Sequence, residues 1–335
     1  MDFLNALVAL TNYIIIPAST YGAQLALGAL GVTLIYGILR FSNFAHGDTM
    51  AFGTGLAIIV TWGLQAMGVS LGPLPTAMLA LPFAIAGTAV LVLVTDRLVY
   101  AHYRRVKAKP VTLVMVSVGV MFVMNAVTRF MIGVDDIKFA DGARFVISAR
   151  GFKEATGLAE PLAFRTTQLL TLVTAAIMVA ALFWFLNRTR TGKSMRAFSD
   201  NEDLALLSGI NPNQVVRVTW IIAAGLAVTA GTLYGLDKSF KAFNYFHLLL
   251  PIFAAAILGG LGSPLGAIAG GFIIAFSEVG VTYAWKKVAT YMIPGFEAEG
   301  LLQLLSTEYK FAVSFVILIA VLLFKPTGLF KGKAV

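Results

Sequence analysis

Seven runs without a charged side chain set the pattern of hydrophobic and polar positions along the chain. A membrane-spanning helix needs about 20 consecutive, mostly apolar residues. The second run is long enough for two spans, and Gly72 to Pro75 provides the turn between them. The sixth divides near Gly259 to Pro264. The runs without Asp, Glu, Lys or Arg are 3–39, 49–95, 111–128, 166–187, 218–236, 242–277 and 311–324.

The first run contains a proline, which divides it in our prediction. We expect a short helix over 3–15, an interruption at Pro17 and a span over 18–39. The last run is short, but Lys310 and Lys325 flank it and can reach the two interfaces. The pattern therefore predicts an all-α, polytopic transmembrane bundle with eight or nine hydrophobic segments, some short or broken, in a single domain over 1–335.

Composition excludes a water-soluble protein. Of the 335 residues, 59% are hydrophobic and 12% are charged, whereas soluble domains average about 25% charged residues. The chain has no cysteine, and its three histidines lie far apart in the sequence. Disulfides and thiolate chemistry are therefore excluded, and we predict no metal site and no catalytic residue. A membrane-embedded enzyme is the least favoured of three hypotheses. Such an enzyme needs clustered titratable groups, and the sequence offers few.

The net charge of +9 reflects membrane topology rather than nucleic-acid binding. We assign Arg40, the 96–109 and 188–217 loops and the C-terminal tail to the cytoplasmic side, where Lys and Arg accumulate. That side then has 14 Lys and Arg residues against 10 on the outer side. The pattern predicts an outer N-terminus and a cytoplasmic C-terminus. We expect the basic run from Arg97 to Lys109 to lie against anionic lipid.

The polar loop over 188–214 predicts a short helix between two spans. Ser199 and Glu202 have the spacing of a capping box, and acidic residues fill the first turn that follows. Gly209 is a natural helix end, and Asn211 with Pro212 predicts the start of the next helix. The residues alone favour an ordinary connecting helix slightly over a docking element, since docking requires a partner.

Each half of the chain has a hydrophobic segment broken by small or polar residues. In many transporters such breaks mark the substrate pathway. One alternative is capping of the broken helix by Asn43, His46 and Asp48. The other is close helix crossings at the small-residue repeats Gly231, Gly235 and Gly262, Gly266, Gly270. Glu278 is expected near the outer end of its span. The pathway candidates are Asn43, His46, Gly47, Gly260, Gly262, Ser263 and Gly266.

Four separated motifs, in order between about 18 and 330, resemble one family. The spacing of Gly192, Arg196-Ala197, Asn201, Ala205 and Gly209-Ile210-Asn211 resembles the cytoplasmic coupling loop of permeases in branched-chain amino-acid ABC importers. The other motifs resemble the LivH-type subunit: the segment after the first span, a late Gly-rich segment and the last span. They are 43–47, 256–263, and 306–310 with 314–315 and 326–328.

This resemblance implies a type II ABC importer permease in the bacterial inner membrane, with no cofactor of its own and no bound nucleic acid. ATP and Mg²⁺ would belong to two ATP-binding subunits. The other implied partners are a second, LivM-like permease, a periplasmic substrate-binding protein and the lipid bilayer. The 188–214 loop would engage the ATPase through Gly192, Arg196, Ala197, Asn201, Glu202, Leu204, Ala205, Leu207, Gly209, Ile210 and Asn211.

The implied substrates are branched-chain or other hydrophobic amino acids. Departures from the family pattern at 245–253, and an outer insertion over 284–308, leave urea, short amides and small organic acids as alternatives. A stand-alone secondary transporter is the second hypothesis, although no buried carboxylate pair for ion coupling is visible in the sequence.

Overall fold

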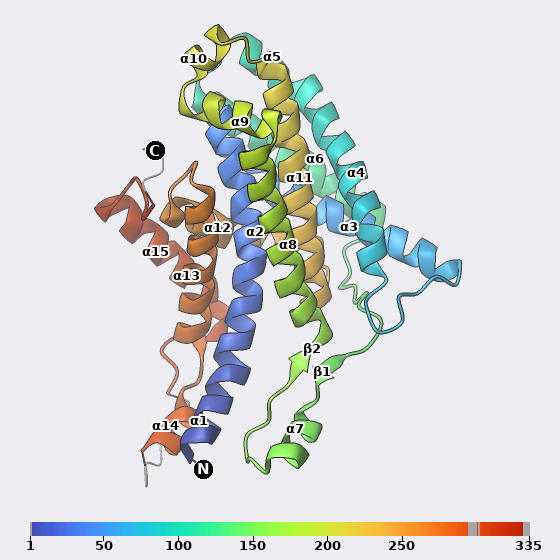
Figure 1. Cartoon of the computed structure of the whole chain (residues 1–335), viewed down its shortest axis with the longest axis vertical. Coiled ribbons are helices and arrows are strands. Elements are labelled where there is room, and N and C mark those ends of the chain that lie inside the picture. The colour runs from blue at the N-terminus through green and yellow to red at the C-terminus, as the bar shows by residue number, and fades with distance from the viewer. Residues whose placement is uncertain (1, 294–299, 301, 331–335) are drawn as a thin grey trace.

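The computed structural model describes residues 2–293, 300 and 302–330, which form an elongated helical bundle (Figure 1). In this part of the chain, nine helices are long and apolar enough to cross a membrane, which confirms the predicted all-α transmembrane bundle. The long helices are α2 (Ile16–Leu39), α3 (His46–Ala66), α4 (Ala77–Thr95), α6 (Pro110–Ile132), α8 (Thr166–Arg188), α11 (Pro212–Asp237), α12 (Ala242–Gly259), α13 (Pro264–Thr282) and α15 (Lys310–Phe324).

Short elements lie at the two ends of the bundle. At one end are α5 (Ala101–Arg105), α9 (Arg190–Asp200) and α10 (Glu202–Leu207), which we call the α9–α10 end. At the opposite end, the α7–α14 end, are α1 (Asp2–Leu10), α7 (Ala149–Thr156) and α14 (Lys286–Met292) (Figure 1). The α6–α8 connection also contains antiparallel strands β1 (Phe145–Ile147) and β2 (Phe164–Arg165), which the sequence analysis did not predict.

The predicted interruption at Pro17 is wrong. Helix α1, a π-helical turn over Thr11–Ile15 and α2 form one continuous helix from Asp2 to Leu39. Pro17 lies in the first turn of α2, directly after the π-helical turn. The change of hydrogen-bond register at this junction accommodates the missing proline N–H, so no break is needed.

Helix α2 forms the centre of the bundle. It is buried over almost its whole length and packs against α8, α11, α12 and α13. The outer helices instead expose large apolar side chains, among them Phe122 of α6, Trp184 of α8 and Phe324 of α15. Such surfaces suit a hydrocarbon environment rather than water.

Glycines allow the inner helices to approach closely. Lipid provides little hydrophobic drive for helix association, so the helices depend on close packing, which small residues permit. At Gly231 of α11, an added Cβ would lie 2.9 Å from the Met50 carbonyl oxygen of α3. At Gly259, Gly266 and Gly270, it would collide with backbone atoms across the α12–α13 contact. The close-crossing interpretation therefore holds for Gly231, Gly266 and Gly270.

Candidate functional site

Helix α9 folds back against the end of α8 because Gly192 leaves room for it. An added Cβ at Gly192 would collide with the Phe185 carbonyl of α8. The Thr189 hydroxyl accepts a hydrogen bond from the Gly192 N–H at 3.0 Å and caps the helix. Met195 and Phe198 are buried beneath α9. The loop is thus firmly attached to the bundle rather than free in solvent.

The predicted capping pair, Ser199 with Glu202, is wrong. Ser199 lies in the last turn of α9, and its carbonyl accepts a hydrogen bond from the Arg40 guanidinium at 2.6 Å. Asn201 caps α10 instead, through a hydrogen bond from the Leu204 N–H at 3.1 Å. The expected single helix is therefore two helices joined at Asn201, whose extended backbone breaks the helical run.

The second half of the loop follows the prediction. Gly209 has φ +79°, a left-handed conformation that favours glycine, and it ends α10. The Asn211 side chain accepts a hydrogen bond from the Asn213 N–H at 3.0 Å, and Pro212 is the first residue of α11. Ile210 is half-buried just before this cap. These residues hold α10 in a fixed position between α9 and α11.

Helix α10 presents an apolar surface at the end of the bundle. Leu204 is 60% exposed and Leu207 is 85% exposed, while Ala205 between them is buried. Among the other residues predicted for the loop, Arg196, Ala197 and Glu202 are also exposed. Two solvent-facing leucines on one short helix form a surface suited to a protein partner.

A cavity of about 500 Å³ lies between α2, α8, α9 and the α12–α13 turn. It brings Arg196 from the predicted coupling set together with Gly262 and Ser263 from the predicted pathway set. Helix α2, helix α9 and the α12–α13 turn meet at Gly37 of α2. An added Cβ there would lie 3.2 Å from the Ser199 hydroxyl and 3.8 Å from the Gly262 Cα. The predicted coupling loop and one of the two predicted pathway breaks thus line the same cavity.

The α12–α13 turn depends on its glycines. Gly260 and Gly262 have φ +103° and +87°, values that disfavour other residues. The Ser263 hydroxyl accepts a hydrogen bond from the Gly266 N–H at 3.2 Å and caps α13. Glycine at position 262 therefore serves the turn rather than a helix crossing, since an added Cβ there would meet no atom within 4 Å. Without a side chain, Gly262 takes up no space in the cavity that it lines.

The first broken segment lies elsewhere, in the packed interior. Asn43 accepts a hydrogen bond from the Tyr100 hydroxyl at 3.2 Å. His46 is buried against Gly31 of α2, where an added Cβ would lie 2.6 Å from the imidazole. An added Cβ at Gly47 would likewise lie 2.8 Å from the Tyr245 carbonyl oxygen of α12. None of these three residues lines the cavity between α2, α8 and α9.

The charged groups buried in the bundle include Asp96, which the sequence did not indicate as a site residue, and Glu278, which lies near the end of α13 where it was expected. Asp96 forms a bidentate ion pair with Arg104, at 2.5 and 2.9 Å, and accepts a third hydrogen bond from the Trp220 indole at 2.8 Å. Glu278 is buried and accepts a hydrogen bond from Ser314, between α13 and α15. Asp96 and Arg104 are distant in sequence from Trp220, so only the fold joins them.

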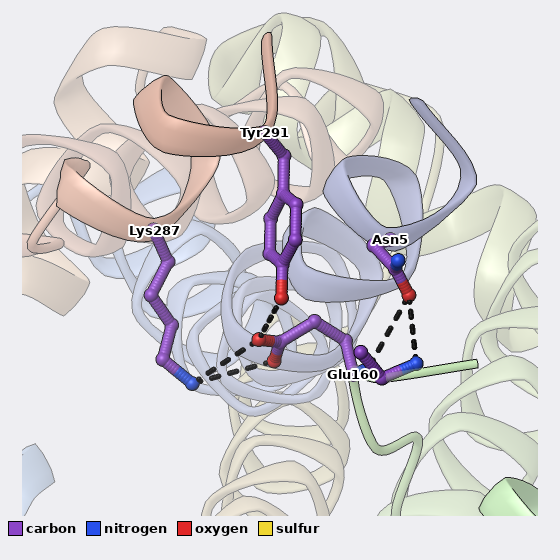
Figure 2. A network of polar contacts seen from close by, with 5 residues as sticks. Asn5, Glu160, Lys287 and Tyr291 are labelled. Atoms are coloured by element: carbon purple, nitrogen blue, oxygen red, sulfur yellow. Dashed lines mark hydrogen bonds and ion pairs between the residues drawn. The ribbon is translucent and has the colours of Figure 1, made fainter. Parts of the chain in front are cut away.

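At the α7–α14 end, a polar network connects three segments (Figure 2). The carboxylate of Glu160 accepts hydrogen bonds from the Tyr291 hydroxyl at 3.0 Å and from Lys287 at 3.3 Å. The Asn5 side chain accepts hydrogen bonds from the Ala159 and Glu160 N–H groups. Burial and the bond to Glu160 raise the pKa of Tyr291, so the phenol remains a donor. Of the predicted insertion over 284–308, residues 294–299 and 301 lie outside the described residues.

Asp141 ties the α6–α8 connection to the α3–α4 loop at the same end. Its carboxylate accepts hydrogen bonds from the Thr76 N–H and hydroxyl, at 2.7 and 2.6 Å, and from Gln65 at 3.0 Å. Partial burial acts to raise the pKa of Asp141, but these hydrogen bonds outweigh it and lower the pKa below 3.8. The charged form therefore stabilises this contact.

We expect this contact to depend on pH. A lowered folded-state pKa contributes stability above pH 3.8, the ordinary value, and the contribution is lost as pH falls through the lower folded value. Asp141→Asn should increase proteolysis of the 67–76 loop at neutral pH and remove the acid dependence. Asp136→Asn, at an exposed position in the same connection, is the control. Equal cleavage of both variants would contradict the assignment.

The nine candidate spans among the described residues define a polytopic helical membrane protein. A family model described as "Branched-chain amino acid transport system / permease component" matches residues 14–322. The chain belongs to this family of ABC-type permeases.

Its curated relatives agree over most of the chain. The high-affinity branched-chain amino acid permease LivH of Escherichia coli K12 is 29% identical over 316 residues, and the alignment covers 92% of each chain. LivH of Salmonella typhimurium LT2 is 28% identical over 318 residues with the same coverage. A chain of the PsaBC structure from Streptococcus pneumoniae superposes with a TM-score of 0.46 at 11% identity, covering 98% of this chain and 93% of that chain. The family assignment rests on the sequence matches.

Proposed function

We propose that the chain is the LivH-type permease subunit of an ATP-driven importer of branched-chain or other hydrophobic amino acids. The observation that carries the proposal is the cavity of about 500 Å³ that joins the α9–α10 loop to the α12–α13 turn. In this proposal the chain forms part of the substrate path and hydrolyses no ATP. ATP and Mg²⁺ bind on two separate ATP-binding subunits.

Coupling would proceed through the shared wall of that cavity. Docked through Leu204 and Leu207, an ATP-binding subunit would carry α10 and α9 with it as it closes on ATP. Arg196 and Ser199 of α9 line this cavity together with Gly262. A shift of α9 therefore changes the space in front of the start of α13. This is a two-state element that both the ATPase and the pathway can bias.

The lining of the cavity favours hydrophobic amino acids over urea, amides or small organic acids. Arg196 and Asp200 offer one charge of each sign, as a zwitterion requires. Apolar side chains from four helices, α2, α8, α9 and α13, supply the rest of the wall, and they suit an aliphatic side chain. The apolar lining consists of Leu34, Ile38, Phe183, Leu186, Met195 and Leu265.

The proposed assembly lies in the bacterial inner membrane, with the α9–α10 end in the cytoplasm. The basic residues of the 97–109 connection support this orientation. A second, LivM-like permease would complete the translocation path. A periplasmic substrate-binding protein would deliver substrate at the α7–α14 end.

Uptake into vesicles tests the function. Inside-out and right-side-out vesicles containing the complete transporter are supplied with ATP and labelled leucine, valine, phenylalanine, urea or acetamide. We expect ATP-dependent transport of the amino acids that requires the binding protein. Flux driven by an ion gradient in vesicles that contain only this chain would instead establish a secondary transporter.

A further inference from the structure

A second, larger cavity opens at the α9–α10 end, on the other side of α9. This groove has a volume of about 1010 Å³ and lies between the α4–α6 connection on one side and α9, α10 and α11 on the other. Basic side chains dominate its polar lining. The six cationic residues are Arg40, Arg97, Arg104, Arg105, Lys107 and Arg217.

Two of these six cations already have partners. Arg104 is bound to Asp96, and Arg40 donates to the Ser199 carbonyl. For the other four, no carboxylate oxygen lies within 4.0 Å among residues 2–293, 300 and 302–330. Glu202 is the only acidic residue on the groove besides Asp96. The groove therefore has an excess of positive charge that the described chain does not neutralise.

The groove is also amphipathic and continues onto the apolar exterior. Leu39, Leu93 and Leu113 contribute to its lining below the cations. Beside it, Leu98 is 73% exposed and Val111 is 64% exposed. A free phosphate ion would use only the cations, whereas a phospholipid uses both parts: its phosphate meets the cations and its acyl chains lie along the apolar surface.

We propose that this groove binds the headgroup of an anionic phospholipid, with the phosphate held by Arg97, Arg105, Lys107 and Arg217. Arg217, on the opposite wall, belongs to α11, which begins directly after the α9–α10 loop, and Phe198 of α9 lines the groove beside it. A bound headgroup therefore bridges the α4–α6 connection and the α9–α10 loop. The lipid would stabilise the position of this loop, so that its function depends on the lipid composition of the membrane.

Titration with a soluble short-chain lipid tests the site directly. The purified full-length chain in detergent is titrated with dihexanoylphosphatidylglycerol or dihexanoylphosphatidylcholine, and binding is followed by native mass spectrometry and by the thermal midpoint. We expect selective binding of phosphatidylglycerol. Each basic residue near a lipid phosphate contributes about 1 kcal/mol, so R97Q/R105Q/K107Q should weaken this binding about a hundredfold.

Two controls separate this site from general charge and from misfolding. K138Q/R150Q/K153Q removes the same charge at the α7–α14 end and should leave the affinity unchanged. R97K/R105K keeps the charge and should retain selectivity for phosphatidylglycerol. Equal binding of the two lipids, equal losses in both triple variants, or full displacement by millimolar inorganic phosphate would overturn the proposal. The assembled transporter with R97Q/R105Q/K107Q is also tested for retention of its ATP-binding subunits. If the variant chain binds lipid normally but the assembled transporter loses an ATP-binding subunit, the groove belongs to that subunit instead.

Discussion

Replacing Leu207 with aspartate is expected to abolish ATP-driven uptake by detaching the ATP-binding subunit. The side chain is 85% exposed at the end of α10, so its replacement should change the stability of the isolated chain little. In the proposed complex it is buried, and burial of a leucine contributes about 1.5–3 kcal/mol. Loss of that contact alone weakens association at least about tenfold, and an unpaired buried carboxylate weakens it further.

Co-purification of the ATP-binding subunit and uptake in vesicles provide the two readouts for this variant. Val146→Asp is the matched control, because Val146 is also exposed and apolar but lies on β1 at the α7–α14 end. It should retain the ATP-binding subunit. Normal association and uptake by Leu207→Asp would show that α10 is not the docking element.

The second large effect is expected at the contact between α12 and α13. Gly270→Leu should destabilise the protein severely, because even a Cβ at this position collides with the Ala255 carbonyl of α12. Overpacking of a tight contact costs about 1–3 kcal/mol and occasionally more. This cost opposes a gain in helix propensity of up to about 1 kcal/mol on replacing glycine. Separation of α12 from α13 would also displace Gly262 and Ser263 at the cavity.

Gly280 provides a control within the same helix. An added Cβ at Gly280 meets no atom within 4 Å, so Gly280→Leu keeps the gain in helix propensity without the collision. Thermal unfolding in detergent should show a lowered midpoint for the Gly270 variant and an unchanged or raised one for the Gly280 variant. Equal midpoints would contradict the close crossing.

The sequence predicted the spans well because lipid imposes a simple rule on them. Runs without charge gave the long helices to within a few residues, and the Gly259–Pro264 turn and the Asn211–Pro212 cap follow from local chemistry alone. The Pro17 interruption failed because Pro17 lies in the first turn of α2, after a π-helical turn that no local pattern in the sequence indicates. The Ser199 cap failed because two capping residues competed, and burial of Met195 and Phe198 extended α9 past Ser199.

Spatial relations between distant segments could not be predicted. Gly37 carries no motif, yet α2, α9 and the α12–α13 turn meet there. Asn43 and His46 stay predicted pathway residues, and their burial between helices could not be inferred from their neighbours in the sequence. The pair of Asp96 and Trp220 likewise depends on α4 and α11 lying side by side. A single sequence indicates which residues are unusual, not which of them meet.

In the proposed transporter, α10 contacts an ATP-binding subunit and moves with it. Because the chain has no cysteine, Leu207→Cys introduces the only thiol of this chain, and a thiol-linked photo-crosslinker can be attached to the purified chain before the transporter is assembled. We expect a crosslink from Leu207→Cys to the ATP-binding subunit whose yield changes when ATP is added, and no crosslink from Val146→Cys. A crosslink from Val146→Cys but not from Leu207→Cys would contradict this contact.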